Sequence, residues 1–303
     1  MNKEIVIIPR GGLGDVIVST PMLAQLKQTY PQSKLIVYYT MRSHGAILEN
    51  NPDIDFCCHY RLRSMWRKPR HFFWMIFNRE RINANLLSFQ HIPPTFIYSK
   101  SIKEIIADIF DLKLNNTNVR LFFTEKEDKA AISRLSAYKN VVLMHIHSRS
   151  ASNHHWRMEN WNSLVKQLPD YTFIQLGHDD EPLVEGALDW RDKTTIREML
   201  CLLKHSTSFI GVDSSLSHAT NAFDLPGVVL FGDSSPVFWG HDNNINIYKK
   251  VTCSPCYYYL YAAKCPYNHE CMEAITIDEV REALIKQVTK SNERIKPGSK
   301  INN

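Results

Sequence analysis

The amino-acid sequence predicts an α/β fold made of two Rossmann-like domains that face each other across a central cleft. Two observations lead to this prediction. Strand-like and helix-like segments alternate in two successive series, and turns rich in small residues follow several of the strands. Such alternation is typical of parallel sheets covered by helices, which bind ligands beyond the carboxyl ends of their strands. The length of 303 residues is enough for two domains, each with its own core.

The first series belongs to an N-terminal domain expected over residues 1–122, on the acceptor side of the cleft. Short apolar runs bounded by turn residues predict its strands. In chain order we expect a strand at 5–9, a helix at 21–30, a strand at 34–39, a helix at 43–50, strands at 55–59 and 95–99, and a helix at 103–110.

The second series belongs to a C-terminal domain expected over residues 123–290, after a polar turn at 115–118. In chain order we expect a helix at 125–138, a strand at 140–147, a helix at 159–168, a strand at 171–176, a helix at 196–204, and strands at 208–212 and 227–231. Residues 291–303 are polar and predict a tail that frays.

The composition, with 44% hydrophobic and 22% charged residues, fits a soluble globular protein. No run of eighteen apolar residues occurs, so we expect no membrane-spanning helix. The first residues lead directly into a strand without a cleavable signal, which predicts a cytoplasmic location. Seven cysteines, an odd count, argue against a disulfide framework in that compartment.

The net charge of +5 is mild, but basic residues are concentrated between Arg61 and Arg81. Aromatic residues are interleaved with them, and acidic residues are almost absent. This pattern suits an anionic membrane surface, a phosphorylated glycolipid or nucleic acid. It equally suits a helix with an aromatic core face and solvated arginines. The basic residues are Arg61, Arg63, Arg67, Lys68, Arg70, Arg79 and Arg81.

A glycine turn that carries one acid follows the first strand. Gly11, Gly12 and Gly14 let the backbone turn sharply and approach a ligand, and a helix begins after them. The spacing is neither that of a dinucleotide-binding turn nor that of a phosphate-binding loop. Asp15 at the helix start is a candidate general base, which we expect the surrounding amides to hold ionised. Alternatively, Asp15 only caps the helix.

The strand that ends at Val212 leads into a second turn of the same kind. Asp213, Ser214 and Ser215 place an acid, hydroxyls and backbone N–H groups at a helix N-terminus, and His218 lies one turn further on. Another turn of small residues, 232–236, follows the strand that ends at Phe231.

Together these segments resemble glycosyltransferase family 9, the family of bacterial ADP-heptose:lipopolysaccharide heptosyltransferases. The matching segments span most of the chain in the family's order, and their combination is specific, whereas any one alone would be weak. They are Gly11–Val16 with Thr20-Pro21, Trp156 with Trp161, Asp189 with Thr194–Glu198, Gly211–Ala222, Pro226–Gly232 and Cys253-Ser254-Pro255-Cys256.

The resemblance implies a GT-B fold and an inverting, metal-independent transfer by a heptosyltransferase. It implies that Asp15 is the base for the acceptor hydroxyl, that Asp213 contacts the donor sugar and that His218 lies at the same site. The backbone amides of the turn Ser214, Ser215 and Leu216 are implied to hold the diphosphate. On the acceptor side we expect Gly11, Gly12, Leu13, Gly14, Arg61, Arg63 and Arg67.

Two departures from the family concern the donor. The family's lysine before the Trp-Pro motif is His154 here, and its proline is Arg157, so Arg149, His154 and Arg157 are candidates for the phosphate contact. Ser215 stands where the family usually has glycine. ADP-heptose is therefore the default donor, and another nucleotide sugar remains open.

Further donor-side candidates are Gly177 and Glu198. Gly177 ends a strand on the side of the expected cleft, and the family uses the segment of Glu198 near the nucleotide. Glu198 could equally lie on a solvated helix face. We expect Trp156 and Trp161 to serve packing rather than base stacking.

Four cysteines lie within nineteen residues, with His269 nearby. Their spacing suits a tetrahedral structural site for zinc or iron, and some relatives that modify proteins carry an iron site there. Reduced packing thiols are the alternative. No cofactor is expected to take part in the transfer. The four residues are Cys253, Cys256, Cys265 and Cys271.

Three functions compete. The first is sugar transfer from a nucleotide sugar, ADP-heptose favoured, to a lipopolysaccharide core or related glycan, with possible peripheral contact with the inner face of the inner membrane and no nucleic-acid partner. The second is an autotransporter-type protein heptosyltransferase, favoured by an intact metal site. The third is a non-catalytic nucleotide-binding module, which has no need of Asp15 as a base.

Overall fold

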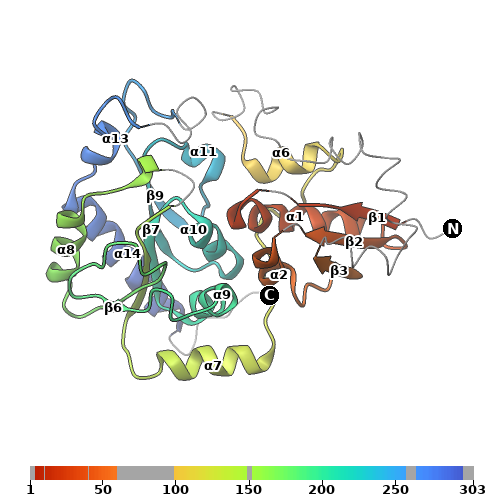
Figure 1. The fold of residues 1–303 in the computed structure, drawn as a ribbon, viewed down its shortest axis with the longest axis horizontal. Helices are drawn as coiled ribbons and strands as arrows, with labels where there is room; N and C mark the ends of the chain where they lie inside the picture. Colours follow the sequence, from red (N-terminus) through yellow and green to blue (C-terminus); the bar gives the residue numbers. More distant parts are fainter. Residues whose placement is uncertain are drawn as a thin grey trace. The chain divides into compact units, whose positions relative to one another are not determined.

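The structure, a computed structural model, describes residues 4–9, 11–39, 41–59, 99–148, 152–256 and 264–295. The chain forms two compact units, residues 1–124 and 125–303, each built around a parallel sheet (Figure 1). The α/β class expected from the sequence is confirmed. The basic segment 61–81 and nearly all of the expected strand at 95–99 lie outside the described residues.

The first unit contains a three-stranded parallel sheet in the order β1-β2-β3. Its central strand packs Ile36 and Tyr38 against Ile8, and helix α1 packs on α2 and α6. The elements are β1 (Glu4–Ile7), α1 (Leu13–Thr29), β2 (Lys34–Tyr39), α2 (Arg42–Leu48), β3 (Phe56–His59) and α6 (Ile102–Asp108).

Helix α1 begins at Leu13, so Asp15 lies in its first turn as the glycine turn indicated, and the helix starts eight residues before the expected range 21–30. Proline has no N–H to donate to the carbonyl four residues earlier, which here belongs to Ile17. The hydroxyl of Thr20 donates to that carbonyl instead, at 2.8 Å. The helix therefore continues through the proline, and its buried side chains reach the glycine turn without a break.

The second unit contains a six-stranded parallel sheet in the order β6-β5-β4-β7-β8-β9 (Figure 1). Its elements are α7 (Glu125–Leu135), β4 (Val141–His145), a 3₁₀ turn η3 (Ser152–His154), α8 (Met158–Gln167), β5 (Thr172–Gln175), β6 (Leu188–Asp189), α9 (Ile196–His205), β7 (Ser208–Val212), α10 (Ser215–Ala219), η4 (Thr220–Phe223), β8 (Gly227–Phe231), α11 (Pro236–Trp239), β9 (Asn244–Tyr248), α13 (Glu270–Glu273) and α14 (Ile277–Ile295).

Alternate residues of the central strands share one core with helices α8 and α14. Because side chains alternate across a sheet, every second residue of β4, β7 and β8 reaches the same face. Trp156 and Trp161 belong to this core, with ring centroids 4.9 Å apart in a T-shaped arrangement, and the Trp156 indole N–H donates to the Ile275 carbonyl at 3.0 Å. The packing role expected for both tryptophans is confirmed.

The last described helix, α14, continues to Ile295, beyond residue 290 where the sequence predicted a polar tail to begin. Ser291 is buried, and Gln287 donates to the Gly227 and Asn243 carbonyls at 2.7 and 3.0 Å. These contacts hold the end of α14 against the sheet, so the helix continues into the polar segment.

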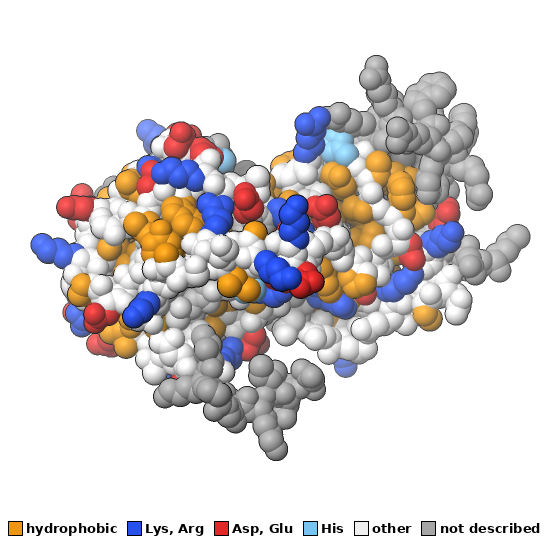
Figure 2. Space-filling model, turned by 90° about the horizontal axis from the view of Figure 1, so that it is seen from below, with side chains coloured by type: hydrophobic (Ala, Val, Ile, Leu, Met, Phe, Trp, Pro, Cys, Tyr) orange, Lys and Arg blue, Asp and Glu red, His pale blue; other side chains and the backbone are white. Residues whose placement is uncertain are grey.

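Among the described residues, no helix combines the length and the apolar character needed to cross a bilayer. Figure 2 shows basic and acidic side chains interspersed over one face, with no broad area of either sign among the coloured residues.

Candidate functional site

In the first unit, the glycine turn closes tightly around the carboxylate of Asp15. Gly11 has a positive φ of 93°, and a Cβ at this position would collide with Asp15 Oδ2. The Gly12 N–H donates to the same oxygen at 2.6 Å. Only glycine combines this backbone conformation with the close approach, so the turn shapes the site of the acid.

Asp15 occupies the third position of α1 and accepts from the N-cap residue Gly12, so it does cap the helix. Burial raises the pKa of Asp15 to about 6, although the backbone N–H groups of Gly12 and Asp15 act in the opposite direction. The sequence analysis expected the amides to dominate; desolvation is the larger effect. A carboxylate with this pKa is a better proton acceptor than an ordinary aspartate and is still mostly ionised at neutral pH.

His44 lies on the other side of the same turn. Its side chain is 0% exposed, and its Nε2–H donates to the Gly11 carbonyl at 3.2 Å. No sequence motif pointed to this residue, because it comes from α2, 33 residues away along the chain.

In the second unit, the strand order reverses between β4 and β7, the arrangement that makes the carboxyl ends of a parallel sheet a binding region. His145, the last residue of β4, and Ser214, just after β7, meet there through a hydrogen bond of 2.9 Å between Nδ1 and the hydroxyl. Burial lowers the pKa of His145 to about 4, with smaller contributions from His147 and His178, so its ring is neutral at cellular pH.

Asp213 is buried at this place and has polar partners from two further segments. Its Oδ2 accepts from the Ser234 hydroxyl at 2.6 Å, and its Oδ1 lies 3.7 Å from His218 Nε2. The other nitrogen of His218 lies 3.0 Å from Nε2 of the buried His241. The residues Asp213, Ser214 and His218, singled out from the sequence, therefore gather at one point.

His154 stands directly behind the Asp213 turn. Its Nδ1–H donates to the Asp213 carbonyl at 3.0 Å, and its Nε2 pairs with the carboxylate of Asp233. Burial acts to lower the pKa of His154, but the hydrogen bond and charge of Asp233, with the charge of Asp213, outweigh it and raise the pKa. Both ring nitrogens are occupied by protein groups in this structure.

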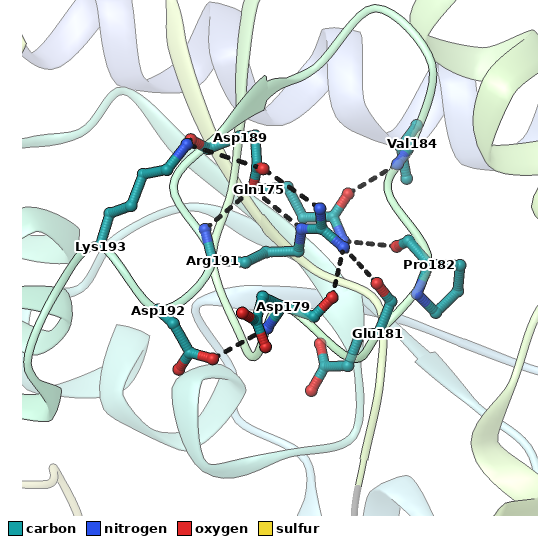
Figure 3. Close-up of polar contacts among 9 residues, drawn as sticks. All are labelled: Gln175, Asp179, Glu181, Pro182, Val184, Asp189, Arg191, Asp192 and Lys193. Atoms are coloured by element: carbon teal, nitrogen blue, oxygen red, sulfur yellow. Dashed lines mark hydrogen bonds and ion pairs between the residues drawn. The ribbon is translucent and has the colours of Figure 1, made fainter.

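Gly177, with a positive φ of 131°, opens a loop after β5 that Arg191 holds from inside (Figure 3). The Arg191 guanidinium binds both oxygens of Asp189, at 2.8 and 3.1 Å, and donates to the carbonyls of Asp179 and Glu181. The hydrogen bond from Arg191 lowers the pKa of Asp189 to about 2.

Two further side chains, those of Gln175 and Asp192, fix the ends of this loop. The Gln175 amide donates to the Pro182 carbonyl and accepts from the Val184 N–H, both at 2.8 Å (Figure 3). Asp192 accepts from the Asp179 N–H at 3.0 Å. The loop is thus held by hydrogen bonds from its own and neighbouring side chains.

Other predicted donor residues lie elsewhere. Arg157 is exposed and pairs with Glu273 at 2.6 Å. Glu198 is exposed and accepts from the Thr195 N–H at 2.7 Å as part of the cap of α9, which agrees with the solvated-face reading. Ser215 is half-buried and Leu216 is buried at the start of α10. The predicted arginines Arg61, Arg63, Arg67 and Arg149 lie outside the described residues.

The four clustered cysteines gather beside Asp233. Burial raises the pKa of Cys256 to about 12, and the charges of Asp233 and of the other three thiols act in the same direction with smaller effect. The donor set suits zinc or iron chemically. However, in the described part of the chain no three of these sulfur atoms lie within 4.8 Å of one another, so they stand farther apart than the ligands of one ion.

One group of potential ligands that does lie within 4.8 Å consists of Asp128, Cys201 and His205, on the packed helices α7 and α9. The ammonium of Lys204 already lies 2.8 Å from both carboxylate oxygens of Asp128. The group therefore has the character of an ion-pair network that joins the two helices.

The sequence analysis assigned no role to four residues that the structure places at these sites: His44, His145, Asp233 and Ser234. The turn 232–236 was recognised as a turn of small residues at a strand end, and this signal could have pointed to Asp233 and Ser234. His44 and His145 carried no such signal.

Comparison with known families gives one match. The model of glycosyltransferase family 9 (heptosyltransferase) matches residues 99–265. No curated protein sequence matches the chain.

Solved structures resemble the chain over nearly its whole length. A family 9 glycosyl transferase from Veillonella parvula is 16% identical, with 95% of this chain and 97% of that chain covered and a TM-score of 0.70. The ADP-heptose lipopolysaccharide heptosyltransferase II of E. coli is also 16% identical, with coverages of 96% and 99% and a TM-score of 0.72. These likenesses confirm the GT-B fold class expected from the sequence.

The iron-containing dodecameric glycosyltransferase TibC from enterotoxigenic E. coli is 18% identical, with 96% of this chain and 78% of that chain covered and a TM-score of 0.70. A second structure of TibC contains ADP-D-β-D-heptose.

Proposed function

The chain belongs to glycosyltransferase family 9 and is a glycosyltransferase, and on this premise we propose that it transfers heptose from ADP-heptose to a lipopolysaccharide core or a related glycan. The description of the family model names heptosyltransferases. Two proteins of the same fold, the E. coli heptosyltransferase II and TibC, are named for or crystallised with ADP-heptose, which supports this donor. We further propose that the transfer inverts the anomeric carbon.

The observation that carries the proposal is the setting of Asp15. A carboxylate with its pKa raised to about 6, held by the Gly12 N–H in a turn that leaves no room for a side chain at Gly11, is suited to accept a proton. In the proposed reaction Asp15 takes the proton of the acceptor hydroxyl as that oxygen attacks the anomeric carbon. General base catalysis of this kind contributes roughly 10²- to 10⁴-fold.

The donor is proposed to bind at the carboxyl ends of β4 and β7. Asp213 contacts the sugar, and the first N–H groups of α10, at Ser215 and Leu216, hold the diphosphate, because N–H groups in a first helical turn have no intrahelical acceptor. These donors stabilise the negative charge that develops on the leaving diphosphate. His145 positions Ser214, and His218 faces Asp213.

His154 supports this turn through the Asp213 carbonyl, and we propose this indirect role for the residue that stands in place of the family's lysine. Arg149 remains a candidate for the phosphate contact. The nucleotide is proposed to lie against the loop that opens at Gly177, which Arg191 holds in place.

The acceptor is proposed to lie beside the turn Gly11–Gly14, with Arg61, Arg63 and Arg67 as partners for anionic groups of a glycolipid. This arrangement would suit peripheral contact with the inner face of the inner membrane. No cofactor has a part in the proposed transfer.

A second candidate is an autotransporter-type protein heptosyltransferase. The observation that favours it is the gathering of Cys253, Cys256, Cys265 and Cys271 beside Asp233, together with the likeness to the iron-containing TibC. In both candidates a metal held by these thiols would have a structural role and would supply no chemistry to the transfer.

The test is calorimetric titration of the purified protein with ADP, UDP, GDP, CDP and dTDP, followed by a transfer assay with the selected nucleotide sugar. Selective binding of ADP is expected. Selection of another nucleotide would replace the donor, and binding of none of the five would contradict the donor site. Asp213→Asn should impair transfer, because a contact to the donor sugar is lost. Comparison with nucleotide binding separates the contact to the sugar from recognition of the nucleotide.

A further inference from the structure

A single peptide unit separates a buried histidine from the carboxylate of Asp15. The carbonyl of Gly11 and the N–H of Gly12 belong to the same planar peptide and point in opposite directions, because the peptide is trans. The carbonyl accepts from His44 Nε2 at 3.2 Å, and the N–H donates to Asp15 Oδ2 at 2.6 Å. The three residues therefore form one hydrogen-bonded series.

The tautomer of His44 follows from its partner. A carbonyl oxygen only accepts, so Nε2 carries the proton. Nδ1 is buried and has no hydrogen-bond partner in the described part of the chain. Burial lowers the pKa of His44 below its ordinary value, and the charge of His59 acts in the same direction, so the neutral form of the ring is favoured.

The Gly11–Gly12 peptide needs such a partner. Glycine on both sides of a peptide bond leaves its plane free to rotate at little steric cost. If the plane rotated, the Gly12 N–H would turn away from Asp15, and a donor that lowers the pKa of this acid would be lost. Hydrogen bonds in series also polarise one another, so a donor on the carbonyl strengthens the N–H at the other end.

We propose that His44 is a positioning residue for Asp15, which holds the Gly11–Gly12 peptide so that its N–H remains on the carboxylate and sets the proton affinity of the base. The inference rests on the proposed function only in taking Asp15 as the catalytic base. The coupling of His44 to Asp15 through one peptide does not depend on that function.

Few other titratable groups of the described residues approach His44. On β3, His59 lowers the pKa of His44 by its charge. On β2, Tyr39 packs beside the neighbouring Gly45, and burial raises the pKa of that phenol above 10, far from the range of interest. On α1, Asp15 is the group that titrates near neutrality.

The test measures the pKa of Asp15 without substrate, from the ¹³C carboxyl shift of aspartate-labelled protein, with Asp15→Asn to assign the signal. His44→Leu removes the donor, and we expect the pKa of Asp15 to rise by about 0.5–1 unit. His44→Gln places an amide N–H at the same reach and should bring the pKa back toward that of the native protein. The acidic limb of kcat/KM should shift by the same amounts.

An unchanged Asp15 pKa in His44→Leu, or equal shifts in the Leu and Gln variants, would overturn the proposal. A measurement on the unsubstituted protein guards against variants that do not fold. The ¹⁵N shifts of the neutral His44 ring should show the Nε2–H tautomer, and an Nδ1–H tautomer would contradict the coupling. If Asp15→Asn retained full transfer while the shifts were seen, the base role alone would fail.

Discussion

His154 and Asp233 form an ion pair that is almost completely withdrawn from solvent, with 3% and 2% of their side chains exposed. The pair joins the turn after β8 to η3, and the second ring nitrogen of His154 extends the connection to the Asp213 carbonyl after β7. Three segments at one edge of the sheet are thus held by a single imidazole.

Removing one partner of this pair leaves the other as a buried, unpaired charge. We expect His154→Ala to lower the free energy of unfolding by about 3–5 kcal/mol. A matched control is His178→Ala, which breaks an exposed pair with Asp192 whose side chains are 50% and 47% exposed, and should cost less than about 1 kcal/mol. Urea unfolding of both variants measures the difference.

The same pair has a definite pH dependence. Because the pKa of His154 is raised above 6.5 in the folded protein, its stabilisation is complete below that value and is lost as the pH rises through the folded pKa. The difference in stability between the native protein and His154→Ala should therefore be largest near pH 6 and should shrink at higher pH. A difference that grew with pH would contradict the assigned charge.

Asp15→Asn keeps the shape of the acid and an oxygen for the Gly12 N–H. We expect transfer to fall by about 10²- to 10⁴-fold, while the Kd for ADP stays unchanged, since a base stabilises the transition state more than the ground state. Glu104→Gln is the matched control, because Glu104 also accepts from its N-cap N–H, that of Ser101 at 3.1 Å, in the same unit. Equal loss of activity in both variants would show that Asp15 acts only as a helix cap and not as the base.

The raised pKa of Asp15 also predicts a pH profile. The base must be unprotonated, so kcat/KM should rise with pH through a midpoint of about 6 and level off above it. Measurement between pH 5 and pH 8 in buffers of constant ionic strength gives the midpoint. A midpoint near 4, the ordinary value for aspartate, would show that the turn does not shift the acid.

Arg191→Ala should loosen the loop that opens at Gly177. The variant loses both contacts with Asp189 and the two contacts with loop carbonyls. The free-energy cost of ordering the loop then has to come from the binding of the ligand, which lowers its affinity. We expect the Kd for ADP to rise by up to about tenfold with a smaller change in kcat. Arg191→Lys should recover part of the loss, since lysine cannot bind two carboxylate oxygens side by side.

Arg281→Ala is the control for this substitution. Arg281 is a half-buried arginine of the same unit that contacts Gln167 at the end of α8, which leads into the opposite end of β5. A similar rise in Kd in this variant would point to general destabilisation of the unit.

Metal analysis tests the cysteine cluster. As the structure places them, the four sulfur atoms are too far apart to share one ion, so a four-thiol site requires them to move closer together. If they do, protein purified without added metal should contain about one equivalent of zinc or iron, and Cys256→Ser or Cys271→Ser should lose it. Cys201→Ser should retain it, because this buried cysteine lies on α9 beside Asp128. Native protein free of metal, or loss of metal only from Cys201→Ser, would argue against the four-thiol site.

The strands that position the donor site could be predicted closely. β7 and β8 have the bounds expected from the sequence, 208–212 and 227–231, because short apolar runs between turn residues leave little choice. The placement of Asp15 at a helix start is confirmed, but the expected range 21–30 for this helix began too late. Proline commonly occupies a first helical turn, and the hydrogen bond of the Thr20 hydroxyl that replaces the missing N–H is a local detail.

The polar contacts of the site were much harder to predict from the sequence. Asp15 and Asp213 stand in turns that can be recognised from the sequence. Asp233, the partner of His154, follows a different strand, and His44, the partner of Gly11, lies on another helix. Only the parallel order of the strands brings such residues together. Sequence spacing carries no information on that order, and the balance of burial against hydrogen bonding at Asp15 also depends on it.

The position of α14 has a consequence for how the protein is made. Val280, Leu284 and Val288 complete the core formed by β4, β7 and β8, and Gln287 binds the first carbonyl of β8. During synthesis the sheet of the second unit therefore leaves the ribosome with the part of this apolar face that α14 covers still exposed, while α8 is already available to cover the rest. A chain truncated before residue 277 would lack α14 and expose this part of the core to chaperones and proteases.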